Sequence, residues 1–108
     1  QIIADSSRGV AGNYTQSGTG ILNMEISGPS ASQIDQLMIA GQANLGGTLN
    51  VSLLFGFVPS TGQVYSLLTY GSRSNTFTTV NLPTFPGGRF DPRYDDPLYP
   101  NAFTLWVV

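Results

Sequence analysis

The chain has 108 residues with four arginines, six acidic residues and no lysine, histidine or cysteine, and its formal net charge is -2. Four scattered arginines form no basic patch able to displace counterions from nucleic acid, so we expect no nucleic-acid partner. The missing residue types exclude a disulfide framework, a thiolate metal site and an imidazole general base.

Charged residues make up only 9% of the chain, whereas about 25% is usual for soluble domains. Serine, threonine, asparagine and glutamine must therefore keep the surface in water, which is typical of secreted β proteins. Little charge repulsion then opposes self-association. No stretch approaches the ~18 apolar residues that cross a bilayer, so we expect no membrane span. These features favour a secreted or cell-surface location.

Apolar and polar residues alternate along most of the chain, which predicts strands with one buried face. In the clearest of them, Leu49, Val51 and Leu53 alternate with polar residues. The predicted strands, in chain order, are residues 21–27, 37–45, 48–53, 64–69, 75–80 and 103–107. Gly41 is expected to bend the second of them, and a turn follows at residues 46–47.

Residues 32–38 fit either a short helix with Ser32 as its N-cap or the start of a strand. The strand is favoured, because an isolated helix this short is marginal in water. Proline, glycine and aspartate then dominate residues 83–101, and this composition predicts a loop. The sequence thus predicts one all-β domain over residues 1–108, with a Pro/Gly/Asp-rich loop at 83–101.

Three segments share motifs with a known family. Residues 12–28 contain G-N-Y-T-Q followed by G-I-L, residues 34–51 contain D-Q-L and L-G-G-T-L, and residues 56–69 contain G-F-V-P and L-L-T. From Gly12 to Pro83 the chain resembles the C-terminal coils of autotransporter-type and filamentous-haemagglutinin-like passenger regions. The resemblance implies a right-handed parallel β-helix that serves as a shaft or an adhesive face. An antiparallel β-sandwich would show the same alternation and is the alternative.

Acidic residues cluster in the predicted C-terminal loop. Asp91, Asp95 and Asp96 offer the hard oxygen ligands that calcium prefers, so one interpretation is a calcium site. In the other, Arg89 and Arg93 neutralise these carboxylates on a solvated loop. Calcium is the one cofactor that the sequence suggests.

Aromatic residues gather in the same region. Phe90, Tyr94, Tyr99 and Trp106 are candidates for contact with a partner, because aromatic rings stack on sugars and on other subunits. The alternative is that these rings cover the protein's own core. Asn13 and Asn50 each begin an N-x-S/T pattern and would carry glycans if the source is eukaryotic.

Catalytic motifs are missing from the sequence. There is no G-x-S-x-G nucleophile elbow, and Glu25 and Asp35 are the remaining candidates for a pair of catalytic carboxylates. We therefore expect a structural or adhesive module rather than an enzyme. Its expected partners are other copies of itself, with which it would form a fibre, or neighbouring modules of a larger surface protein. The alternative function is a carbohydrate-binding domain that uses the C-terminal loop and its aromatic rings on glycans.

Overall fold

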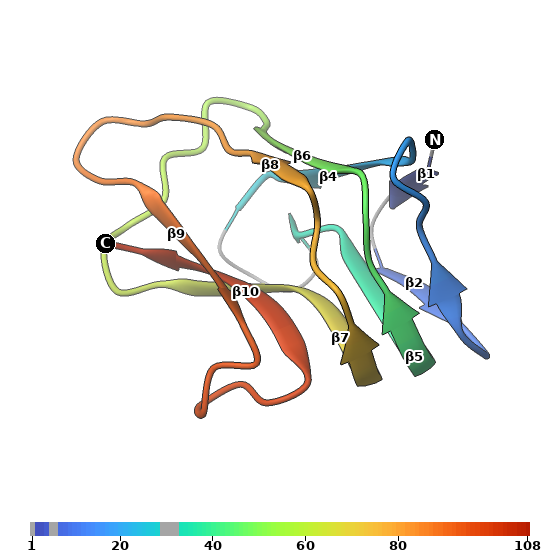
Figure 1. Cartoon of the computed structure of the whole chain (residues 1–108). Coiled ribbons are helices and arrows are strands. Elements are labelled where there is room, and N and C mark those ends of the chain that lie inside the picture. The colour runs from blue at the N-terminus through green and yellow to red at the C-terminus, as the bar shows by residue number, and fades with distance from the viewer. Residues whose placement is uncertain (1, 5–6, 29–32) are drawn as a thin grey trace.

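The protein consists of two layers of β-strands (Figure 1). A computed structural model describes residues 2–4, 7–28 and 33–108, which contain no α-helix. Sheet A consists of the parallel strands β1 (Ile2–Ala4), β4 (Ile21–Ile26), β6 (Thr48–Leu53) and β8 (Thr79–Asn81), in that order. Sheet B has the order β2 (Ser7–Val10), β5 (Gln36–Asn44), β7 (Val64–Ser74), β10 (Ala102–Val107) and β9 (Phe90–Tyr94), and β3 (Tyr14–Thr15) also pairs with β5.

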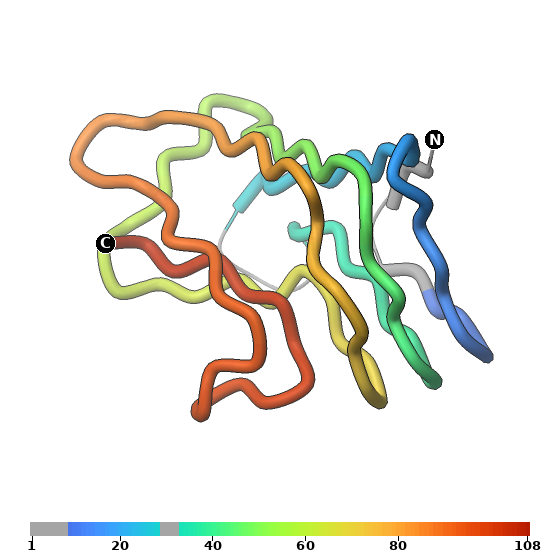
Figure 2. The backbone as a smooth tube through the Cα atoms, in the orientation of Figure 1, coloured from blue at the N-terminus to red at the C-terminus, as the bar shows by residue number. Residues whose placement is uncertain are grey.

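The chain crosses between the two sheets and advances from one flank to the other. Figure 2 shows the N-terminal passes at one flank and the C-terminal strands at the opposite one. In sheet B, β2, β3, β5 and β7 are parallel neighbours, whereas β10 runs antiparallel to both β7 and β9. The sequence therefore reaches an antiparallel ribbon only after the parallel part of both sheets is complete.

The alternating residues meet between the sheets as predicted. Leu22 of β4 pairs with Leu49 of β6, and Leu49 with Val80 of β8, so equivalent aliphatic side chains lie side by side. The large apolar side chains buried without measurable exposure are Leu22, Met24, Ile26 and Leu49 from sheet A, and Leu67, Leu68, Phe103 and Leu105 from sheet B. Burying each such side chain favours folding by about 1.5–3 kcal/mol. One apolar core holds the two sheets together.

The prediction of a right-handed parallel β-helix is wrong. The two sheets neither close nor form a solenoid, and their layered arrangement fits the alternative sandwich. Most neighbouring strands are nevertheless parallel, and antiparallel pairing is confined to β7, β10 and β9 among the described strands. The parallel stacking of strands that a β-helix requires stops after β8, because Pro83 and Pro86 offer no backbone donor with which to continue a ladder.

The interpretation of residues 83–101 as a loop is also wrong in part, because β9 lies within it and pairs with β10. The chain reverses between these strands through Asp95 and Asn101, which both have positive φ, of 52° and 57°. The preferred strand over residues 32–38 is found from Gln36 onward. Ser32, its alternative helix cap, lies outside the described residues.

A buried glutamine fixes the corner where the chain enters sheet A. Gln16 Nε2 donates to the backbone oxygens of Gly46 at 2.8 Å and Thr48 at 3.2 Å, and its Oε1 accepts from the Tyr14 hydroxyl at 2.7 Å. Glutamine is usually exposed, so nothing in the sequence singled it out. Next to this corner, Gly47 has a φ of 63°, and a methyl group there would collide with the backbone oxygens of Gly20 and Ser17.

Gly47→Ala is therefore expected to lower the free energy of unfolding by at least about 2 kcal/mol, since both the left-handed backbone and the collision oppose the methyl group. Urea denaturation followed by circular dichroism measures this change. Gly18→Ala is the matched control, because a Cβ at Gly18 meets nothing within 4 Å and its φ is not positive. Equal midpoints for the two variants would contradict this account of the corner.

Candidate functional site

The predicted C-terminal site is built on the antiparallel ribbon of β9 and β10. Pairing of Tyr94 with Phe103 and of Asp91 with Trp106 fixes the register of the ribbon. Alternation then sends Phe90 and Tyr94 towards the core, while Asp91, Arg93 and Trp106 lie on the outer face. The candidate residues are therefore divided between two faces.

Phe90 is buried in the core, and Tyr94 is half-buried and packs against it. Phe90 is 5% exposed and contacts the ring of Tyr65 edge-on, with the centroids 6.0 Å apart. The Tyr94 ring lies 4.8 Å from that of Phe103, and its hydroxyl accepts the backbone N–H of Phe77 at 3.1 Å. These two rings thus cover the core, which was the alternative interpretation of the aromatic cluster.

Trp106 and Tyr99 lie on the outer face, but the indole already has partners. The guanidinium of Arg93 stacks 4.1 Å from the Trp106 ring centroid, and Tyr99 meets the indole edge-on at 5.7 Å. Trp106 Nε1 donates to Thr104 Oγ1 at 2.9 Å. A sugar ring would have to displace Arg93 to stack on that face of Trp106. This geometry gives the carbohydrate-binding interpretation little support.

Two of the three aspartates hold Arg93 over the indole. Arg93 Nε donates to Asp91 Oδ2 at 2.8 Å, and Nη1 donates to Asp96 Oδ2 at 3.2 Å. The pKa of Arg93 is raised, first by the hydrogen bond to Asp91. Exposed ion pairs of this kind are individually weak, so their effect is to orient the guanidinium rather than to stabilise the fold strongly.

The third aspartate closes the turn that follows β9. Asp95 Oδ1 accepts the Tyr70 hydroxyl at 2.7 Å, and Oδ2 accepts Arg73 Nε at 3.1 Å and Nη2 at 2.9 Å. The same guanidinium lies 4.8 Å from the Tyr94 ring centroid. Sequence analysis missed Tyr70 and Arg73, because both are far from Asp95 in the chain. We call Tyr70, Arg73 and Asp95 the β7 latch.

The three carboxylates do not converge on one point. Asp95 belongs to the β7 latch, whereas Asp91 and Asp96 bind Arg93. Within residues 2–4, 7–28 and 33–108, no group of three His, Cys, Asp or Glu side chains is placed to hold a metal ion. Arginines neutralise these acids, as in the alternative interpretation, but the arginines are Arg73 and Arg93 and not the expected Arg89 and Arg93.

The remaining candidates serve the backbone and the sheet surface. Asn13 is exposed, and its Oδ1 accepts the backbone N–H of Gln42 at 2.9 Å. Asp35 Oδ2 accepts the backbone N–H of Glu25 at 2.8 Å, so this carboxylate connects the start of β5 to β4. Asn50 is half-buried in sheet A.

Asn50 is the middle member of an amide ladder on the outer face of sheet A. Its Nδ2 donates to Asn23 Oδ1 at 3.1 Å, and its Oδ1 accepts Asn81 Nδ2 at 2.8 Å. In-register parallel pairing aligns the three side chains. A glycan on Asn50 would replace one of the two hydrogens on the nitrogen that makes the first of these bonds, so it would have to fit beside Asn23 in the ladder.

Comparisons with protein-family models, curated proteins and solved structures found no match for this chain. The resemblance to autotransporter-type passenger coils stays a prediction. No helix in the described part of the chain has both the length and the apolar character needed to cross a bilayer.

The burial of three tyrosines should make the folded protein less stable at high pH. Burial raises the pKa of Tyr65, Tyr70 and Tyr94, and the hydrogen bond and charge of Asp95 raise that of Tyr70 further. In the unfolded chain tyrosine titrates near its usual pKa of about 10. The folded state therefore holds its phenolic protons more tightly. The stability that the protonated tyrosines contribute is fully present below about pH 10, and it is lost as pH rises through their raised pKa values.

The free energy of unfolding is thus expected to fall above about pH 10, by up to about 1.4 kcal/mol per pH unit for each of these tyrosines. Urea titrations at pH 8, 10 and 11 measure it, and absorbance at 295 nm reports tyrosinate. The chain has no lysine to titrate in the same range. Tyr70→Phe should make the loss shallower. A free energy that stays constant to pH 11 would contradict the expected burial.

Proposed function

We propose that this chain is a non-catalytic structural module of a secreted or cell-surface protein. It joins other copies of itself, or neighbouring modules, by pairing β-strands along one flank. The observation that supports this proposal is an unequal protection of the two flanks. One flank ends in strands with free edges, and the other ends in strands that resist further pairing.

The flank that carries β1, β2 and β3 is open, and we call it the open flank. Among the described residues, no strand pairs with the outer edge of β1 in sheet A or of β2 in sheet B. Both edges lie on the same side of the molecule (Figure 1). Unpaired backbone N–H and C=O groups in such edges are templates for another strand.

The opposite flank is protected in both sheets. In sheet B the edge strand is β9, where Pro92 offers no backbone donor and the Asp91–Arg93 ion pair adds charge. In sheet A the edge strand β8 is followed closely by Pro83. Prolines and charges are features by which β proteins prevent edge pairing. A module with one open and one protected flank can pair strands with another copy or module on its open side only.

The chemistry of the predicted site also supports a structural role. Its aspartates bind arginines, and its tryptophan is covered by Arg93. The low charge of the chain leaves little repulsion between copies.

Two lysines on the open flank are expected to prevent strand pairing there, because like charges on an edge disfavour a second strand. Gly12→Lys combined with Thr15→Lys places them there, since a Cβ at Gly12 meets nothing within 4 Å and Thr15 is exposed. Light scattering across protein concentrations should show association of the wild type and a several-fold weaker association of this variant.

The matched control is Thr76→Lys combined with Thr84→Lys, which changes the net charge equally at two exposed positions away from the open flank. It should associate as the wild type does. Equal association of both double variants would show that the open flank is not the joining surface. A wild type that stays monomeric at high concentration and across salt would count against self-assembly.

A further inference from the structure

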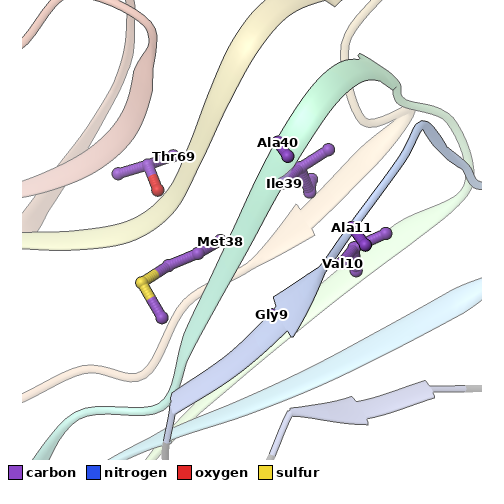
Figure 3. A pocket seen from close by; sticks show the side chains of 7 residues that line it. All are labelled: Gly9, Val10, Ala11, Met38, Ile39, Ala40 and Thr69. Atoms are coloured by element: carbon purple, nitrogen blue, oxygen red, sulfur yellow. The ribbon is translucent and has the colours of Figure 1, made fainter.

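An apolar hollow lies on the outer face of sheet B, and we call it the outer hollow. It has a volume of about 420 Å³ and is formed by β2, β5 and β7 with the residue after β2. Figure 3 shows Met38 and Ala40 of β5 with Val10 of β2 around it, and Thr69 supplies the hydroxyl on one side. The described residues that line it include none with a charge. Because β2 is also the edge strand of the open flank, the outer hollow borders that flank.

A protruding aromatic side chain lies elsewhere on the same chain. Phe55 is 91% exposed, more than any other large hydrophobic residue described. Its φ is 57° and that of Gly56 is 68°, and Phe57 N donates to Leu54 O at 3.1 Å. Two successive positive φ values define a turn of type I′, whose first central position usually takes Asn, Asp or Gly. Phenylalanine there is unfavourable for the backbone and for hydration, so folding alone does not explain it.

The turn is anchored so that Phe55 projects from a fixed base. Leu54 N donates to Ile26 O of β4 at 2.9 Å, and the Phe57 ring packs edge-on against Tyr65 at 6.4 Å. Val58 next to it is 47% exposed and extends the apolar tip. The segment between β6 and β7 leaves sheet A towards the side of β9, away from β2 (Figure 1). A rigid projection loses little conformational entropy when it binds.

We propose that Phe55 of one copy docks into the outer hollow of a second copy. The protruding ring and the apolar hollow that exceeds it in size are on the same chain, and both are apolar in the part of the chain that the structure describes. The contact joins two different surfaces, so each added copy still presents one free Phe55 and one free outer hollow. Such a contact is heterologous and builds an open row of copies. This inference rests on the proposed function and names a second contact between copies, in addition to strand pairing along the open flank.

Sedimentation velocity of complementary variants tests the docking. Phe55→Ser removes the ring and keeps the outer hollow, whereas Ala40→Glu puts a charge into the outer hollow and keeps Phe55. Both residues are exposed, so neither variant should lose its fold. Each variant alone keeps strand pairing along the open flank, so it is expected to stop at the dimer at concentrations where the wild type grows into larger species. An equimolar mixture should grow beyond the dimer, because Phe55 of the Ala40→Glu copies can dock into the intact outer hollow of the Phe55→Ser copies.

Leu98→Ser is the control, since Leu98 is 74% exposed in a different loop, and it should associate like the wild type. If Phe55→Ser associates as strongly as the wild type while the lysine pair on the open flank prevents association, the docking is wrong and the proposed function stands. A mixture that grows no larger than the single variants also overturns the docking. A monomeric wild type overturns the docking together with self-assembly.

A different occupant of the outer hollow has its own signature. Binding of the dye 8-anilinonaphthalene-1-sulfonate to a monomeric wild type, lost in Ala40→Glu and kept in Phe55→Ser, would assign the outer hollow to a small apolar ligand and overturn the docking.

Discussion

The structure depends on in-register parallel pairing of short strands, which places like side chains beside like. Leu22, Leu49 and Val80 follow one another across sheet A inside the core, and an amide ladder follows the same register outside it. A shift of one residue would turn the whole aliphatic row to water. The corner at Gln16 and Gly47 holds this register, because its hydrogen bonds and close backbone contacts leave no room for slippage.

This register also explains a surface with so little charge. Amide side chains one strand apart satisfy one another's donors and acceptors, so polar faces need few charged residues to remain hydrated. The charges are concentrated instead where parallel pairing ends, on β9 and in the β7 latch. There the antiparallel ribbon, Pro92 and the ion pairs of Arg93 protect the last edge of sheet B. The contrast between this flank and the open flank is the basis of the proposed joining role.

Much of the fold was predictable from sequence, because alternation reports which residues are buried. Leu49 and Val51 are buried as expected, and β4, β5, β6 and β10 lie close to their predicted places, whereas β1, β2 and β3 were not predicted. Alternation does not distinguish parallel from antiparallel partners, and the family resemblance led to a solenoid that the structure does not have. β9 escaped prediction, because Pro92 and its charges are typical of loops. The partners of Asp95 were not predictable either, since they come from a distant strand.

The most direct test of the parallel register is a methyl-detected nuclear Overhauser experiment on the folded protein. The account predicts cross-peaks between the methyl groups of Leu22 and Leu49 and between those of Leu49 and Val80, from strands that are neighbours in sheet A. The account would be contradicted if the methyl groups of Leu49 showed cross-peaks with neither Leu22 nor Val80, or showed cross-peaks with water.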